Sequence, residues 1–374
     1  MAKGMKSLNA IHGAIFFVLF AVLINTAASD SSPQLPDNAA ALDAWFSSYV
    51  KPVGGRKGLD PLLVAAEAKP KIIRVRQKGG GDFKTITDAV KSIPLKNTQR
   101  VIVDIGDGVY TEKVTIGVDQ PFVTFYGSSK SMPTLAFGGT AKQYGTDDSA
   151  TLIVMGDYFV AANMIIKNTA PRPEGKPGGQ GVALRIWGNK AALYSCRLLG
   201  FQDTLCDDHG MHFYKDCYIE GTVDFIFGRG KSMFVNTMIH VVKDIYLTVI
   251  TAHARSMPEE DTGFVFAHCR ISGDGDGAAN RNGAYLGRAW MAMPRVIFAH
   301  TRMSKAVCPD GWYDNVHPER QKTVEFAEYM STGPGYTPGK RVKYSKQYTA
   351  AQVKPYLSLD FIRAAEWLLP PPKL

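Results

Sequence analysis

The stretch from Tyr194 to Gly228 reads YSCRLLGFQDTLCDDHGMHFYKDCYIEGTVDFIFG, and it repeats itself. Shifted by 21 residues, the segment CRLLGFQD at 196–203 falls over CYIEGTVD at 217–224, so that a Cys, a Gly and an Asp coincide. A repeat of about 20 residues is typical of a solenoid, in which each repeat forms one coil and packs only against its neighbours.

Short apolar segments of the same kind flank this stretch on both sides. Counted on the residue that follows each segment, the repeat positions are 163, 196, 217, 237, 269 and 301. A unit of about 20 residues with occasional loop insertions explains the spacing, and the partly alternating segments predict strands. We therefore expect an all-β fold, a right-handed parallel β-helix with flanking terminal helices. The right hand is expected because connections between parallel strands are right-handed.

Stacking of the coils makes specific predictions about neighbours. Coils about 4.8 Å apart place residues one period apart side by side, so Asp203 should lie beside Asp224. Cys196, Cys217 and Cys269 occupy the repeat position and should point inward as small apolar groups. A disulfide between Cys196 and Cys217 is within reach in this register but is not required.

The first 29 residues differ in character from the rest of the chain. Lys3 and Lys6 precede a mostly apolar run from Ile11 to Ile24, and small residues follow at 26–29. This pattern predicts a secretory signal peptide, because the apolar run is short for a membrane span. We therefore expect residues 1–29 to be the signal peptide, 30–70 an N-terminal extension with a helix, and 71–374 the β-helix with a C-terminal helix.

Charge and cysteine content narrow the class of partner. Removal of Lys3 and Lys6 with the signal lowers the formal net charge from +9 to +7, which favours a polyanion as partner. An acidic polysaccharide fits an exported protein better than nucleic acid, whose usual binding modules the chain lacks. The five Cys form no CxxC pair and match no zinc pattern, so no metal is predicted.

Two terminal segments are predicted to be helical. Residues 37–50 favour a helix capped by Asp37 or Asn38. The tail from Ser358 to Leu368 has an amphipathic pattern, and we expect its helix to cover an open end of the coil stack, which would otherwise expose strand edges.

Polar residues recur at nearly the same period in the strand-rich region. Gln180 lies 22 residues before Gln202, and Asp203 lies 21 residues before Asp224, so coil stacking would bring the four together. Two adjacent carboxylates should titrate apart, which suits acid–base and nucleophilic work, and side-chain amides can donate to an oxyanion. Each residue alone is weak evidence, and their joint spacing carries the hypothesis.

Five blocks of the sequence resemble the signature blocks of plant pectin methylesterases. They are GVYTE at 108–112, QGVALR at 180–185, GFQDTL at 200–205, GTVDFIFG at 221–228 and LGRAW at 286–290. The resemblance runs from about Lys71 to the C-terminus. It implies a right-handed parallel β-helix and hydrolysis of the galacturonate methyl esters of pectin (homogalacturonan) to acid and methanol, without a cofactor.

The resemblance also implies a role for each matching residue. Asp224 would be the nucleophile and Asp203 the general acid–base, with Gln180 and Gln202 as the oxyanion site and Arg288 holding Asp224 ionised. The implied substrate contacts are Thr146, Gln180, Phe225, Arg288 and Trp290. Gly181 departs from the Ala of many members, and the proline-rich loop before Gln180 is longer than usual.

Three further expectations come from the resemblance. The protein would be secreted to the cell wall, act as a monomer without membrane or nucleic acid partners, and be open to a proteinaceous pectinesterase inhibitor. The large inhibitor-like pro-region of many plant members would be missing. Two alternatives stay open: a pectin lyase or glycosidase on the same fold, and a non-catalytic pectin-binding wall protein.

Overall fold

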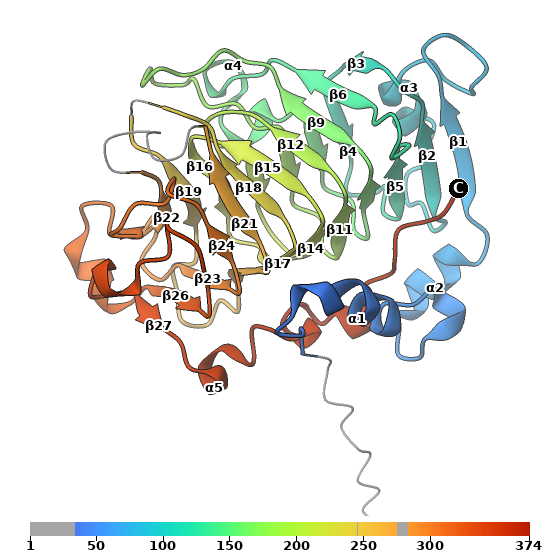
Figure 1. The fold of residues 1–374 in the computed structure, drawn as a ribbon. Helices are drawn as coiled ribbons and strands as arrows, with labels where there is room; N and C mark the ends of the chain where they lie inside the picture. The colour runs from blue at the N-terminus through green and yellow to red at the C-terminus, as the bar shows by residue number, and fades with distance from the viewer. Residues whose placement is uncertain (1–33, 245, 275–282) are drawn as a thin grey trace, which may run out of the picture. The chain divides into compact units, whose positions relative to one another are not determined.

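The computed structural model describes residues 34–374 except 245 and 275–282, so the predicted signal peptide lies outside the described residues. The described residues form one compact unit. Its strands are gathered in three sheets, one of eleven strands and two of eight, and each named strand pairs in parallel with its sheet neighbours (Figure 1). The predicted right-handed parallel β-helix is confirmed.

The eleven-stranded sheet contributes one strand to each coil. Its strands in order are β1 (Lys71–Val75), β2 (Val101–Ile105), β5 (Val123–Tyr126), β8 (Val160–Ala162), β11 (Ala191–Tyr194), β14 (Met211–Lys215), β17 (Lys231–Val235), β20 (Gly263–Ala267), β23 (Arg295–Ala299), β26 (Glu325–Tyr329) and β27 (Lys346–Gln347).

The two eight-stranded sheets complete the coils. The first, which we call the groove sheet, runs β4 (Val114–Ile116), β7 (Leu152–Val154), β10 (Leu184–Ile186), β13 (Leu205–Asp207), β16 (Val223–Gly228), β19 (Val249–His253), β22 (Tyr285–Arg288) and β25 (Trp312–Tyr313). The second runs β3 (Val109–Thr111), β6 (Thr134–Phe137), β9 (Ile165–Asn168), β12 (Arg197–Leu199), β15 (Tyr218–Gly221), β18 (Met238–Val241), β21 (Arg270–Gly273) and β24 (Arg302–Met303).

Helical segments are short. The α-helices are α1 (Leu42–Tyr49), α2 (Pro61–Glu67), α3 (Ile86–Lys91), α4 (Ala141–Tyr144) and α5 (Ala350–Val353). The 3-10 turns are η1 (Ala39–Ala41), η2 (Val53–Gly55), η3 (Asp147–Ser149), η4 (Pro318–Lys322), η5 (Pro338–Lys340), η6 (Leu359–Ile362) and η7 (Ala364–Glu366). No helix within the described residues is long and apolar enough to cross a membrane.

The predicted repeat positions are right from residue 196 onward, but the first of them, residue 163, is wrong by one residue. Cys196, Cys217 and Cys269 are buried, as predicted, and the structure shows in addition that each follows a residue in the left-handed region. The equivalent residue in the preceding coil is Met164, because Asn163 itself adopts the left-handed turn with φ 57°. Asn tolerates this conformation through local hydrogen bonding of its side chain, and Asn163 donates to the Gly127 carbonyl. All five Cys are free thiols, so the Cys196–Cys217 disulfide is not formed.

Because successive coils pair in the same register, similar side chains stack on one another inside the coils. The rings of Tyr214, Phe234, Phe266 and Phe298 stack in sequence with centroids 4.4 to 4.5 Å apart. All four are fully buried, so each contributes both apolar burial and ring stacking. This interior ladder holds the coils in register and thereby fixes which residues share a position on the outer faces.

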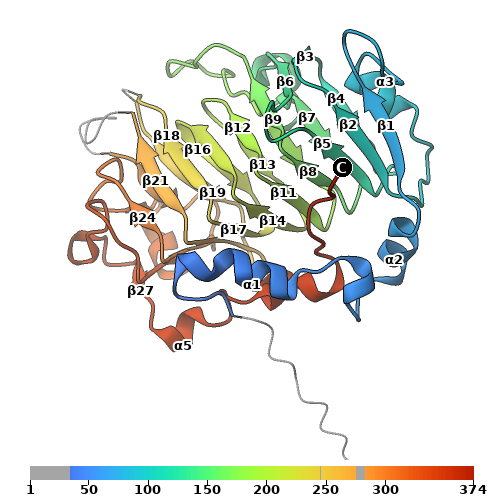
Figure 2. The ribbon, with the colours of Figure 1, turned by 45° about the vertical axis from the view of Figure 1, so that its right-hand side comes forward.

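The N-terminal residues and the tail pack on the outer face of the eleven-stranded sheet (Figure 2). Asn38 caps η1 by accepting from the Ala40 amide, which matches one of the two predicted caps. The predicted tail helix is wrong: it is two 3-10 turns, η6 and η7, interrupted by left-handed Arg363, and η6 lies against β14 and β17. The tail covers a side of the stack because Leu359, Phe361 and Ile362 bury their side chains there.

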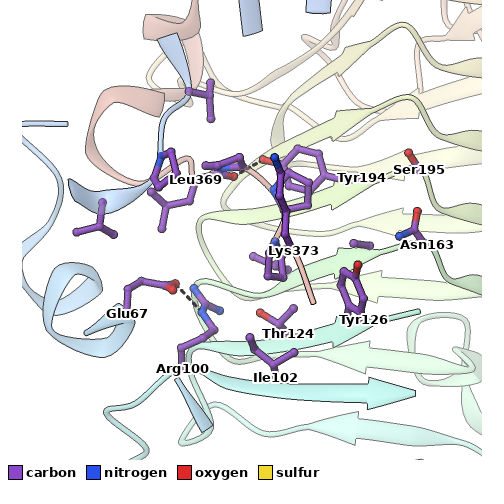
Figure 3. Close-up of a pocket in the computed structure, with 18 of the residues that line it drawn as sticks. Glu67, Arg100, Ile102, Thr124, Tyr126, Asn163, Tyr194, Ser195, Leu369 and Lys373 are labelled. Carbon is purple, nitrogen blue, oxygen red and sulfur yellow. Dashed lines mark hydrogen bonds and ion pairs between the residues drawn. The ribbon is translucent and has the colours of Figure 1, made fainter. Parts of the chain in front are cut away.

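Residues 34–70 are tied to this tail. Gln34 pairs with Ser358, and Arg56 donates to the carbonyls of Ala364, Ala365 and Leu368. Their contacts place them in the same compact unit as the coils. A cavity of about 970 Å³ remains between α1, the tail and the sheet, with the Arg100–Glu67 ion pair on its wall (Figure 3).

Candidate active site

A groove of about 390 Å³ lies on the outer face of the groove sheet. It is lined by Thr146, Asp147, Gln180, Gln202, Asp203, Cys206, Asp208, Asp224, Phe227, Gly228, Arg229, Ala252, Ala254, Arg288 and Trp290. Every predicted site residue except Phe225 is in this set. The larger cavity of Figure 3 contains none of them.

The two aspartates occupy equivalent places in adjacent coils. Leu205 pairs with Ile226, so Asp203 and Asp224, each two residues before a paired position, lie one coil apart as predicted. Both have left-handed backbones, with φ 65° and 48°, a conformation that costs energy in a residue other than glycine. Their side chains are almost fully buried at the floor of the groove. The fold thus holds two carboxyl groups together in a poorly solvated place.

Arg288 pairs with one of these two aspartates, Asp224. Its Nε donates to Asp224 Oδ1 at 2.8 Å, and Nη2 forms an ion pair with the other carboxylate oxygen. The third nitrogen, Nη1, donates to Asn315 Oδ1 at 2.9 Å, which fixes the plane of the guanidinium. The guanidinium also lies over the Trp290 ring, 4.4 Å from its centroid. Asp224 is therefore oriented and charge-paired.

The environment separates the two carboxyl groups electrostatically. Burial, and then the neighbouring Asp224 charge, raise the pKa of Asp203 well above its usual value. Burial also raises the pKa of Asp224, but the charge of Arg288 and its hydrogen bonds oppose that rise. Two close carboxyls of which only one has a cation partner favour a protonated Asp203 beside an ionised Asp224.

The two glutamines meet at the same end of the groove. The Gly181 amide donates to the Gln202 carbonyl at 3.2 Å, which brings Gln180 and Gln202 into adjacent coils. Gln180 Oε1 is buried with no hydrogen-bond partner among the described residues. Gly181 fits closely beside them, because a Cβ there would lie 2.8 Å from Asn168 Oδ1. Glycine at this position therefore accommodates the Asn168 side chain.

Phe225 is a correction to the predicted site. Its side chain is fully buried in the coil interior and does not line the groove. The pairing of β16 with β19 shifts register between Val223 and Ile226, and this irregularity leaves Phe225 and Ile226 both facing the core. Thr146 and Trp290 line the groove, and Trp290 is 46% exposed.

A second charged cluster, of which Asp147 and Asp208 line the groove, was not predicted. Arg185 pairs with Asp208 at 2.7 Å and Asp148 at 3.0 Å, with Asp147 at 3.8 Å. Burial raises the pKa of Asp147 while Arg185 lowers it. Arg185 and Cys206 share a register position, so the 21-residue period applied to outward-facing residues was the signal that could have found this cluster. Among the described residues no group of His, Cys, Asp and Glu is arranged to hold a metal ion.

Comparisons with known proteins identify the family of the chain. A family model described as pectinesterase matches residues 72–365. Pectinesterase 1 of Olea europaea is 50% identical over 363 residues, 96% of this chain and 97% of that protein. Probable pectinesterase 50 of Arabidopsis thaliana is 50% identical over 359 residues, with the same coverage of both chains.

Solved structures are similar as well. The pectin methylesterase from carrot has a TM-score of 0.70 at 29% identity, covering 76% of this chain and 89% of its own. A pectin methylesterase in complex with a hexasaccharide has a TM-score of 0.67 at 25% identity, covering 81% and 99%. The chain belongs to the pectinesterase family.

Proposed function

We propose that this protein hydrolyses the methyl esters of galacturonate in pectin, with Asp224 as nucleophile and Asp203 as general acid–base. The observation that carries the proposal is the unequal treatment of two buried carboxyl groups one coil apart. Arg288 pairs with Asp224, and Asp203 has no such cation within hydrogen-bond distance among the described residues. One group is thereby suited to attack and the other to proton transfer.

The first half of the reaction forms an acyl-enzyme. A carboxylate oxygen of Asp224 attacks the ester carbonyl carbon, and the charge that develops on the carbonyl oxygen is stabilised by the side-chain amides of Gln180 and Gln202. The bond to the methoxy oxygen breaks, and Asp203 gives its proton to that oxygen, so methanol leaves. Asp203 is then ionised, and the galacturonate is joined to Asp224 as an anhydride.

The second half restores both aspartates. Asp203 takes a proton from a water molecule, whose oxygen attacks the galacturonate carbonyl carbon. The bond to Asp224 breaks and releases its carboxylate, which Arg288 stabilises, and Asp203 again holds the proton. The products are methanol and a galacturonic acid group in an uncut polymer, which releases its proton to water and becomes a carboxylate. No step requires a cofactor.

The wider setting is part of the proposal. The signal-peptide pattern of residues 1–29 supports export to the cell wall, with 30–70 as an N-terminal extension and 71–374 as the β-helix domain. The groove is made by one chain, which supports action as a monomer. A proteinaceous inhibitor would act by closing this groove. The hexasaccharide complex of the related enzyme supports a polymeric substrate.

Methanol release from esterified pectin tests the proposal. The wild type should release methanol without shortening the polymer, and Asp224→Asn should lose this activity by about 10²–10⁴-fold or more. Asp261→Asn is the matched control, because that carboxylate is 75% exposed and outside the groove. An unsaturated end would indicate a lyase, a new reducing end a glycosidase, and binding without any product a wall-binding protein. A fully active Asp224→Asn would refute the mechanism.

A further inference from the structure

The groove sheet presents one outward row of side chains that runs along the stack of coils. Strand pairing puts Ile186 beside Asp207, and Cys206 beside Phe227. The outward row one residue farther along lies just after the last residues of β10, β13, β16, β19 and β22, and it comprises Trp187, Asp208, Arg229, Ala254 and Trp290. All of them except Trp187 line the groove. Trp187 continues this row one coil beyond Asp208.

Trp187 is exposed although it is large and aromatic. Its side chain is 40% exposed, whereas Ile186, the last residue of β10, is fully buried, so Trp187 points outward directly after the strand. Its amide donates to the Val154 carbonyl at 2.8 Å, which anchors the backbone. The ring has one aromatic neighbour, His209, with centroids 6.0 Å apart. An indole held in place with a free surface is suited to binding a ligand.

The catalytic pair lies between two exposed tryptophans. Trp187 is one coil before the coil of Asp203, and Trp290 is two coils after that of Asp224. Four coil steps separate the two rings, which corresponds to about 19 Å along the stack. A polymer that runs along this row with an ester at Asp224 would cover both rings, whereas an oligomer of two or three units would not.

We propose that Trp187 forms a second aromatic subsite, on the Asp203 side of the groove, that stacks against the apolar face of a galacturonate ring of pectin. The inference rests on the proposed function and deepens it, because it makes the enzyme selective for substrates long enough to reach Trp187. A pyranose ring offers axial C–H groups to an indole, and the free indole surface loses water when the sugar binds. Trp187 is a binding residue and takes no part in proton transfer.

The test compares fully methyl-esterified oligogalacturonides of two lengths, a trimer and a decamer, by methanol release. For Trp187→Ala the ratio of kcat/KM for the decamer to that for the trimer should fall about tenfold, a loss in binding of about 1.4 kcal/mol. The change should appear in KM for the decamer, since an interaction with a remote unit contributes to binding. Trp187→Phe, which keeps an aromatic face, should recover most of the ratio.

Control variants separate this outcome from general damage. Tyr49→Ala removes another half-exposed aromatic, on α1 and outside the groove, and should leave the ratio unchanged. The subsite is refuted if Trp187→Ala keeps the wild-type ratio, or if it lowers activity on both lengths equally. The proposed function fails by a different result, namely that the wild type releases no methanol from either oligomer.

Discussion

Removal of the Arg288 guanidinium should move the acid limb of the pH–rate profile to higher pH. Asp224 must be ionised to attack, and its buried position favours the protonated form. Arg288 opposes that tendency through two contacts to the carboxylate. With Ala at position 288 both contacts to the carboxylate are lost, so the pKa of Asp224 should rise further.

The size of the shift follows from the pairing. An adjacent opposite charge lowers the pKa of a carboxyl group by about 1–3 units, so its removal should raise the acid limb by a similar amount. On the acid side of the profile each unit removes about nine-tenths of the ionised nucleophile, so activity there should fall about 10–10³-fold. At high pH the carboxylate still ionises, and part of the activity should return.

The assay is methanol release from esterified pectin across the pH range, with thermal unfolding as the check that each variant is folded. Arg288→Lys keeps the charge but not the two-point contact, so its acid limb should lie between those of the wild type and Arg288→Ala. Asn315→Ala keeps the whole guanidinium and removes only the hydrogen bond that Arg288 Nη1 donates to Asn315, so a smaller shift of the acid limb is expected. If the folded Arg288→Ala enzyme has the same acid limb as the wild type, Arg288 does not set the ionisation of Asp224.

Three other predictions follow from the same contacts. Asp203→Asn should lower methanol release by about 10²–10⁴-fold. Because burial raises the pKa of Asp203, folding stability declines as pH rises above about 4 towards the folded-state pKa, and the neutral Asn should raise the melting temperature at pH 7. Gln202→Ala should reduce kcat by about 10²–10³-fold in the same assay. Arg56→Ala should cost about 1–3 kcal/mol in urea unfolding, because three carbonyls of the tail lose a charged donor; unchanged stability would show that water replaces it.

Much of the site was predictable because one coil is one repeat. A spacing of 21 residues does not by itself bring Asp203 and Asp224 together. They are neighbours here because 21 residues form one full coil. Phe225, which the resemblance implied as a substrate contact, was wrong because a register shift inside β16 turns its side chain inward, and no periodic rule anticipates such an irregularity. The expectation for the tail was wrong as well, because an amphipathic pattern indicates burial but not against which surface.

The outward row that contains Trp187 and Trp290 shows a second use of the period. The repeat that aligns Asp203 with Asp224 also aligns Trp187 with Asp208 and Arg229. The steps of this row are irregular because β19 and β22 follow longer loops, so the spacing in sequence hides a regular spacing in space. Along each outward row of a β-helix sheet, every coil contributes one side chain, and the distance between coils sets the spacing of these side chains. A polymer-modifying site is suited to such a surface, since the two reacting carboxyl groups occupy only two adjacent coils and the outward rows of the neighbouring coils remain available to bind the rest of the chain.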